Sequence, residues 1–343
     1  MIESNLTAPE PTEEDIVAEK SLRPSRLSEF IGQEEVVANL QVYIESARRR
    51  NKNLDHVILF GPPGLGKTTL AYIIARELNV NIKVSSGPVL DRPADLAGIL
   101  TNLGERDVFF VDEIHRMSSS VEEYLYSAME DYRIDIMLDK GPNSRSIQLS
   151  LAPFTLIGAT TRMGNLTSPL LERFGVLLRL DFYESKELKQ IITRSAELMD
   201  IAIDSDAADQ IAQRSRGTPR IANRILRRSR DFAEVDGTGH LDLAVAKKAL
   251  KRLGIDELGL DEMDRRILNA LVKTFHGGPV GVETLAVALH ETSRTIEEVY
   301  EPFLIKAGFL QRTSRGRVAL ERTYTFLNME PLPSSKLNQQ RLF

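Results

Sequence analysis

The sequence predicts an α/β protein, in which a parallel sheet carries a phosphate-binding loop and is followed by a small helical domain and a C-terminal winged helix. Three observations lead to this fold class. Residues 57–78 read as a buried strand, a glycine-rich loop and an amphipathic helix. Two further apolar runs, 108–111 and 154–158, each end in polar residues, as buried parallel strands do at their carboxyl ends. From about residue 256, three helical patterns precede a short arginine-rich ribbon, expected over 312–324.

The glycine-rich loop reads GPPGLGKT. Gly61, Gly64 and Gly66 allow backbone N–H groups to turn inward around a polyphosphate. Lys67 adds a charge for the outer phosphates, and the Thr68 hydroxyl can ligate Mg²⁺. An ordinary glycine turn is the alternative, but the complete motif between a strand and a helix favours a site for ATP and Mg²⁺.

The run DVFFVDEIH places two carboxylates at the end of a second strand. We expect Asp112 to hold the metal and Glu113 to orient the attacking water, because phosphoryl transfer depends on positioning. An acidic strand cap is the alternative. His115 is interpreted as a turn or packing residue without a chemical role. At the end of the third strand, Thr161 either senses the terminal phosphate or is simply a good strand residue, and both interpretations stay open.

Composition limits the remaining possibilities. A chain of 343 residues with 42% hydrophobic residues suggests two or three domains. The absence of cysteine excludes disulfides and thiolate metal sites. The acidic start of the chain lacks the apolar segment of a signal peptide, and no apolar run is long enough to span a bilayer, so we expect a cytoplasmic protein without a membrane partner. A net charge of −5 argues against a globally basic nucleic-acid coat.

The motifs GPPGLGKT, FFVDEIH, TLIGATTR, SPLLERFG and RGTPRIANRILRR follow one another in this order. The ordered set resembles the AAA+ ATPases. Together with AMEDYRIDIMLDKGPNSRSIQL and GFLQRTSRGR, it is similar to the bacterial AAA+ motors that drive branch migration of Holliday junctions in recombination and repair. The resemblance extends from about residue 22 to about residue 326.

This resemblance implies a division of the chain into domains. The expected order is a flexible segment (1–21), a large ATPase domain (22–183), a helical lid (184–255), a DNA-binding winged helix (256–329) and a disordered tail (330–343). It also implies a homo-oligomeric ring, expected to be a hexamer.

Roles for individual residues follow from the same resemblance. Arg173 matches the arginine finger, which completes the nucleotide site of a neighbouring subunit, and Arg220 matches the second sensor arginine of the lid. A surface ion pair or a solvated helix arginine would otherwise be the default interpretation of either residue. Further residues match nucleotide contacts of the family: Leu22, Arg23, Thr69, Glu130, Asp131, Tyr132 and Tyr183.

The hairpin pattern at 133–151 alternates apolar and polar residues around a KGPNS turn. It either packs on its own domain or docks a partner, and the resemblance implies docking of a junction-binding protein. A junction-cutting resolvase is a further expected partner. At the ribbon, Arg312 and Arg317 match the family's contacts to duplex DNA, and Arg294 is a weaker match. Ser314 stands where the family pattern has proline.

Two other classes of AAA+ protein share the nucleotide motifs. A protein-remodelling ATPase pulls peptides with an aromatic pore loop and lacks a C-terminal winged helix. A clamp loader ends in a helical collar. The arginine-rich ribbon favours duplex DNA over either alternative, and stimulation of ATP hydrolysis by double-stranded DNA discriminates among the three.

Overall fold

The structure of the chain is a computed structural model that describes residue 19 and residues 21–137, 146–236 and 239–330. The chain divides into two compact units, one over residues 18–190 and one over residues 191–343 with 1–17. The segment expected to be flexible at 1–21 and the tail expected to be disordered at 330–343 lie almost wholly outside the described residues.

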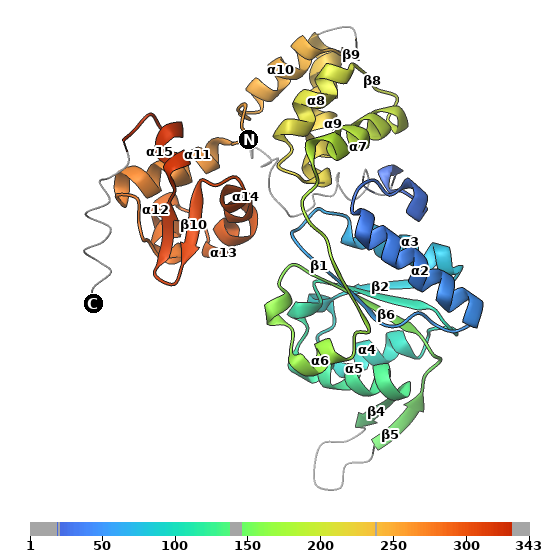
Figure 1. The fold of residues 1–343 in the computed structure, drawn as a ribbon. Coiled ribbons are helices and arrows are strands. Elements are labelled where there is room, and N and C mark those ends of the chain that lie inside the picture. The colour runs from blue at the N-terminus through green and yellow to red at the C-terminus, as the bar shows by residue number, and fades with distance from the viewer. Residues whose placement is uncertain (1–18, 20, 138–145, 237–238, 331–343) are drawn as a thin grey trace. The chain divides into compact units, whose positions relative to one another are not determined.

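The first unit is built on a five-stranded parallel sheet with the strand order β2-β3-β6-β1-β7 (Figure 1). The strands are β1 (Val57–Phe60), β2 (Ile82–Ser86), β3 (Val108–Asp112), β6 (Thr155–Thr160) and β7 (Val176–Arg179). The three strands predicted from apolar runs, β1, β3 and β6, are confirmed and occupy the centre of the sheet. Every residue of β6 is buried, as expected for a strand covered on both faces.

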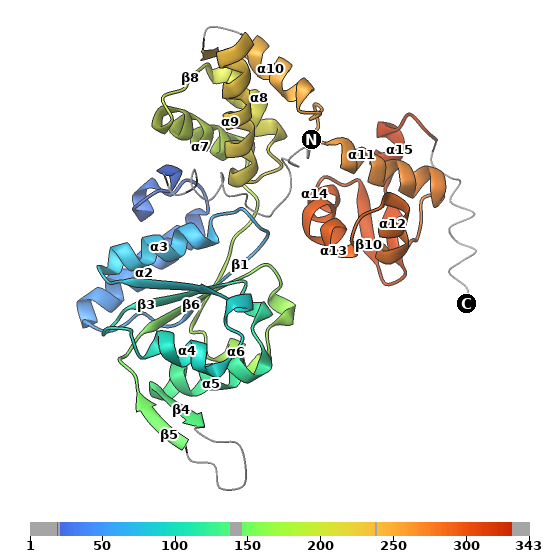
Figure 2. The ribbon, with the colours of Figure 1, turned by 180° about the vertical axis from the view of Figure 1, so that it is seen from behind.

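Helices cover both faces of this sheet (Figures 1 and 2). One face carries α2 (Glu34–Arg50) and α3 (Lys67–Leu78), whereas α4 (Pro93–Leu100), α5 (Ser119–Asp131) and α6 (Ser168–Glu172) lie on the other. The core on the second side includes Phe109, Phe154 and Leu125, which are fully buried. The α/β fold class predicted for the first domain is therefore confirmed.

A two-stranded antiparallel hairpin, β4 (Arg133–Met137) and β5 (Ser146–Ser150), extends from this domain. Ile134 faces Leu149 across the hairpin and is fully buried in the domain core. Further out, Ile147 is 45% exposed. The base of the apolar stripe thus packs on its own domain, while its outer part reaches the surface. The KGPNS turn expected between the two strands lies within residues 138–145, outside the described residues.

The second unit begins within α7 (Ser185–Leu198) and contains a helical lid. Its elements are β8 (Ala202–Ile203), α8 (Ser205–Arg214), α9 (Pro219–Asp236), β9 (His240–Leu241) and α10 (Leu243–Arg252). The helical character expected for this part of the chain is confirmed. Ala207, Ile211, Ile225 and Leu226 form buried stripes on α8 and α9, as amphipathic helices require. No helix among the described residues is long and apolar enough to cross a membrane.

A winged helix follows the lid in the same unit. It consists of α11 (Glu262–Asn269), α12 (Val282–Leu289), α13 (Ser293–Thr295), α14 (Glu301–Lys306), a hairpin of β10 (Leu310–Thr313) and β11 (Gly316–Ala319), and α15 (Glu321–Phe326). π-helical turns continue α11 over residues 270–274 and join α13 to α14 over 296–300. The ribbon expected over 312–324 was placed too far along the chain: its strands end at Ala319, and α15 follows because Thr323 and Tyr324 turn inward to pack on the core.

His56 ties the central strands to α5 through a buried imidazole. Its Nδ1 accepts the backbone N–H of Leu156 at 2.9 Å, and its Nε2 lies 3.2 Å from the carbonyl oxygen of Met129. These two bonds fit the neutral ring with its proton on Nε2. Burial lowers the pKa of His56 below its usual value, because the charged ring would lose its hydration.

We therefore predict a pH-dependent contribution of His56 to stability. The unfolded chain takes up a proton near pH 6.5, whereas the folded ring resists it, so the stabilisation is complete above about pH 6.5 and declines as the pH falls below that value. At pH 8, His56→Ala should destabilise the first unit by about 1–3 kcal/mol, through the lost bonds and packing. Urea unfolding at pH 8 and pH 5.5 should show a smaller difference from wild type at the lower pH.

The control is His240→Ala, which removes a surface histidine whose side chain is 43% exposed. Its effect on stability should be small at both pH values. A His56→Ala difference that stays constant between pH 8 and pH 5.5 would contradict the assignment of a buried neutral ring.

Candidate functional site

The predicted phosphate loop connects β1 to the first residue of α3. Gly61, Gly64 and Gly66 all have positive φ angles, of 143°, 76° and 102°. At Gly61 a Cβ atom would lie 2.2 Å from the carbonyl oxygen of Leu180, so only glycine fits. The loop leads into the N-terminus of α3, where free N–H groups and the helix dipole favour an anion.

Lys67 spans this loop from the first turn of α3. Its Nζ donates to the carbonyl oxygens of Gly61 and Pro62, both at 2.8 Å. The ammonium group is therefore held over the loop, where the outer phosphates of a nucleotide would lie. Thr69, half-buried two residues later, belongs to the same first turn of the helix.

The carboxyl end of β3 meets the first turn of α3 where Asp112 contacts Thr68. The Thr68 hydroxyl donates to Asp112 Oδ2 at 3.2 Å, while Asp112 Oδ1 accepts the backbone N–H of Glu113 at 2.9 Å. A hydroxyl and a carboxylate oxygen this close suit Mg²⁺, which uses one or two protein oxygens together with phosphates and water. No cluster of three or more His, Cys, Asp or Glu side chains suited to a metal occurs in the described part of the chain.

Glu113 has a left-handed backbone, with φ 48° and ψ 43°, at the point where β3 passes into a 3₁₀ turn (Ile114–Arg116). This conformation is uncommon for a residue with a side chain and tends to occur at functional sites. Gly87 packs so closely on the turn that a Cβ atom there would lie 2.3 Å from the carbonyl oxygen of Glu113. The Glu113 side chain is 31% exposed, so the carboxylate is accessible to a water molecule.

His115, interpreted from the sequence as a turn or packing residue, lies between Glu113 and the end of β6. Its Nε2 is 3.4 Å from Glu113 Oε2, and its Nδ1 is 2.9 Å from the hydroxyl of Thr160. Thr160 is fully buried and ends the strand, and the predicted sensor Thr161 follows it, half-buried. The spacing DEIH alone does not reveal this contact, because it depends on the pairing of β3 with β6.

Residues expected at the other end of the nucleotide also lie near the loop. The Tyr183 hydroxyl donates to the carbonyl oxygen of Leu65 at 3.0 Å, and burial raises the pKa of this phenol. The Arg23 guanidinium lies over the ring of Tyr72 on α3, 4.5 Å from its centroid, and its buried Nε has no hydrogen-bond partner among the described residues. Leu22 is buried beside it in the chain. The structure thus brings Arg23 and Tyr183 to α3 and the phosphate loop.

Arg173 belongs to a second cluster, formed by α5 and the end of α6. Its Nη2 lies 3.1 Å from Glu130 Oε1, and its Cζ lies 4.6 Å from the centroid of the Tyr126 ring. The Tyr126 hydroxyl is held in turn by Glu122 and Thr167, at 2.8 and 3.0 Å.

Asp131 and Tyr132, which were also expected to contact the nucleotide, follow Glu130 at the end of α5. Asp131 pairs with Arg133 at 2.8 Å, and the Tyr132 hydroxyl accepts from the amide of Asn53 at 2.9 Å. Of these three residues, only Glu130 pairs with Arg173 in the described part of the chain.

In the lid, Arg220 is the second residue of α9. It is half-buried, near the helix N-terminus. It belongs to the second compact unit, whereas the phosphate loop belongs to the first.

Three arginines were expected to contact DNA on the winged helix, and they differ in exposure. The Arg312 side chain is 62% exposed and lies 3.6 Å from Glu297, while Arg294 is 51% exposed and pairs with Glu298 at 3.0 Å. Arg317, directly opposite Arg312 in the hairpin, is instead only 7% exposed.

The burial of Arg317 has a clear physical reason. Its Nε and Nη2 donate to the two oxygens of Glu301, at 2.8 and 2.9 Å, and Nη2 also donates to Glu297 at 2.9 Å. This side chain therefore connects the β10–β11 hairpin, which we call the wing, to the helical segment that carries Glu297 and Glu301. Of the three arginines, only Arg312 and Arg294 have side chains that are more than half exposed to solvent.

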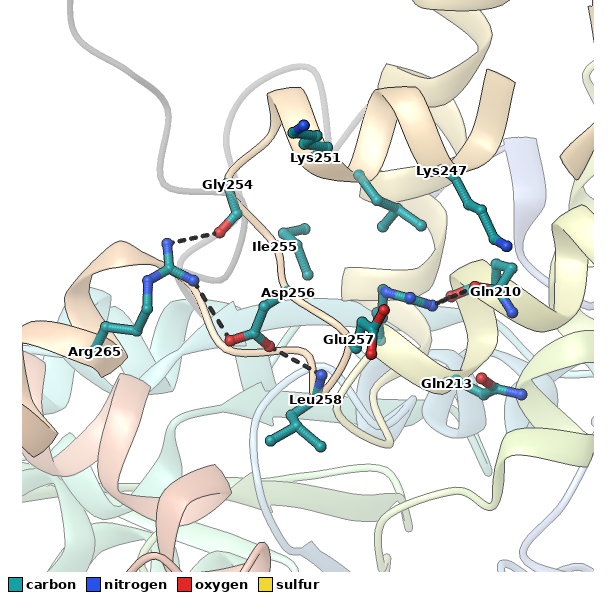
Figure 3. A pocket seen from close by; sticks show the side chains of 12 residues that line it. Gln210, Gln213, Lys247, Lys251, Gly254, Ile255, Asp256, Glu257, Leu258 and Arg265 are labelled. Carbon is teal, nitrogen blue, oxygen red and sulfur yellow. Dashed lines mark hydrogen bonds and ion pairs between the residues drawn. The ribbon is translucent and has the colours of Figure 1, made fainter. Parts of the chain in front are cut away.

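A pocket in the second unit lies between α8, α10 and the chain at 254–258 (Figure 3). It is bordered by Arg265, whose Nη2 donates to the carbonyl oxygen of Gly254 at 3.0 Å. Arg214, which donates to Gln210 at 2.8 Å, also lines it. None of the residues predicted to bind ATP or DNA lines this pocket.

Three consecutive parts of the chain each match a known protein family model. Residues 22–180 match the profile of the Holliday junction DNA helicase RuvB P-loop domain, residues 183–256 that of the RuvB AAA lid domain, and residues 257–328 that of the RuvB C-terminal winged helix domain. The chain belongs to the RuvB family. The predicted fold class, a P-loop ATPase core with a lid and a winged helix, is confirmed, and the RuvB P-loop domain implies that the chain binds ATP.

Individual RuvB proteins are similar over nearly the whole length. The Holliday junction branch migration complex subunit RuvB of Salinibacter ruber is 59% identical over 89% of both chains, and that of Myxococcus xanthus is 57% identical over 94% of both. The solved Thermotoga maritima RuvB Holliday junction branch migration motor is 51% identical, with a TM-score of 0.83 over 91% of this chain and 100% of that one.

Proposed function

We propose that the chain is a subunit of a ring motor that uses ATP hydrolysis to translocate duplex DNA and thereby drives branch migration of Holliday junctions. The observation that carries this proposal is the assembly of Lys67 and Thr68, in the first turn of α3, with Asp112 and Glu113, at the carboxyl end of β3, in a chain that also carries a winged helix. Membership of the RuvB family supports the choice of Holliday junctions over other DNA.

In this proposal each residue of the site has a distinct role. Lys67 contacts the outer phosphates, while Thr68 and Asp112 would hold Mg²⁺, which would supply positive charge beside the phosphate oxygens. Glu113 orients and activates the attacking water from its accessible position beside Asp112. Thr161 lies at the end of β6, where it can contact the terminal phosphate.

Arg173 supplies the remaining cation in trans. A dissociative transition state places charge on phosphate oxygens that a cation from outside the loop stabilises. The cluster of Arg173, Glu130 and Tyr126 lies on α5 and α6, and in a hexameric ring we assign it to the nucleotide of the adjacent subunit. Arg220 serves as a second sensor, so that the nucleotide state is coupled to the orientation of the lid.

The proposed partners use separate surfaces. Duplex DNA contacts the wing, chiefly through Arg312, with Arg294 and the largely buried Arg317 as weaker contributors. A RuvA-type junction-binding protein docks on the hairpin at 133–151, where Ile147 is exposed. A RuvC-type resolvase acts on the same junctions. We assign these tasks to separate domains, with borders at residues 183/184 and 255/256. We also assign the protein to the cytoplasm, where its DNA substrate lies.

We predict that Arg173→Ala preserves ATP binding but slows hydrolysis by a factor on the order of 10³ or more, because the finger acts on the transition state. Mixing this variant with Lys67→Ala should restore part of the activity, since an ATP bound by one subunit can then face an intact Arg173 on its neighbour. Steady-state ATP hydrolysis across mixing ratios is the measurement. Arg49→Ala, which removes a side chain that is 78% exposed on α2, is the control.

Mixed rings must be demonstrated separately, for example by pull-down of one tagged variant with the other. If mixed rings form and no ratio restores hydrolysis, Arg173 does not act in trans.

A second prediction concerns the wing. Arg312→Ala should weaken duplex binding equally for unrelated sequences and reduce the slope of log K against log salt by about 0.9, the value for one lost phosphate contact. Arg312→Lys retains the charge and should keep the slope. An unchanged slope in Arg312→Ala would place the DNA path elsewhere.

Arg317→Ala should behave differently, because it leaves the 4%-exposed Glu301 without its bidentate partner. Breaking such a buried pair costs on the order of 3–5 kcal/mol, so the melting temperature of the winged helix should fall as well. If Arg317→Ala changes only the salt slope and leaves the melting temperature unchanged, Arg317 contacts DNA rather than supporting the wing.

A further inference from the structure

We propose that His115 is a positioning residue that holds the carboxylate of Glu113 in place for hydrolysis and links it to the end of β6. The inference rests on the proposed ATPase role of Glu113. It starts from a chain of contacts: the backbone N–H of Arg162 donates to the Thr160 hydroxyl at 3.0 Å, this hydroxyl lies 2.9 Å from His115 Nδ1, and His115 Nε2 lies 3.4 Å from Glu113 Oε2.

Hydrogen-bond chemistry gives this chain a direction. The Thr160 hydroxyl accepts the N–H of Arg162, so its single proton is available for His115 Nδ1. A ring that accepts at Nδ1 carries its proton on Nε2 when neutral. That N–H then faces the Glu113 carboxylate. The hydrogen bond that Nδ1 accepts from Thr160 thus determines which tautomer is present.

The surroundings hold the imidazole more firmly than the carboxylate. The His115 side chain is 6% exposed, and Thr160 is fully buried. A Cβ atom on Gly158 would lie 2.9 Å from Ile114 Cδ1, so β6 and the turn that carries His115 are packed without spare space. Glu113, by contrast, is 31% exposed at a left-handed backbone position.

This arrangement joins two functional segments. Thr160 is the last residue of β6, and the chain runs on through Thr161 to α6 and Arg173. A displacement of this segment is transmitted through Thr160 and His115 to Glu113. The catalytic base is thereby sensitive to the strand end that the proposed function assigns to phosphate sensing.

The test compares two substitutions that each keep one half of the link. His115→Gln keeps a donor near the position of Nε2 and can still reach Glu113. His115→Asn keeps a polar group near Thr160 but is too short to reach Glu113. We expect His115→Asn to lower kcat on the order of 10- to 100-fold, the size expected when a reacting group loses its position, and His115→Gln to remain within a few-fold of wild type.

ATP affinity and melting temperature are measured for both variants and should match those of the wild-type chain. A merely structural role would lower kcat in both variants alike, or in step with the melting temperature, and either result would overturn the proposal. His240→Gln, at an exposed histidine of the lid, controls for the substitution itself.

Thr160 provides an independent arm. Thr160→Ser keeps the hydroxyl and should retain kcat, whereas Thr160→Val removes it and should lower kcat by no more than His115→Gln does, with KM unchanged, because both variants lose the same contact. Because both residues act through Glu113, adding His115→Asn to Glu113→Gln should cause no further loss in single-turnover hydrolysis. Additive losses would mean that His115 acts by another route. All readouts are ATP hydrolysis and binding, so they remain decisive even if the protein moves no junction.

Discussion

The parallel arrangement of the central strands is the constraint on which the rest of the site depends. Because β1, β3 and β6 run in the same direction and are paired in register, their carboxyl ends meet at one edge of the sheet. Residues distant in the chain are thereby brought into contact, such as Thr68 with Asp112 at 3.2 Å. The burial of all three strands between helices keeps this edge rigid, which positional catalysis requires.

The sequence predicted the centre of this sheet and missed its edges, for a physical reason. Central strands are buried on both faces and read as continuous apolar runs. The edge strands β2 and β7 are only partly buried, and Val84 and Leu177 are about half exposed, at 48% and 49%. Their short alternating patterns do not stand out from loops. The end of the wing was misplaced in a similar way, because α15 packs through only a few inward residues.

The residues that carry local motifs were predictable, whereas those that act through tertiary contacts were not. Lys67 and Asp112 follow from strand and loop patterns alone. His115 acquires its neighbours only when β3 pairs with β6, and Tyr126 meets Arg173 only when α5 packs on α6. The burial of Arg317 had one available signal: Glu297 and Glu301 lie four residues apart and therefore on one helix face.

The central claim is that ATP hydrolysis at this site moves a DNA junction. The most direct test is strand exchange in a fluorescently labelled four-way junction, followed in real time with the protein, a RuvA-type partner, ATP and Mg²⁺. The wild-type chain should move the junction, whereas Glu113→Gln should bind ATP and the junction without moving it. Junction movement at the wild-type rate by Glu113→Gln, or none by a wild-type chain that hydrolyses ATP on duplex DNA, would contradict the account.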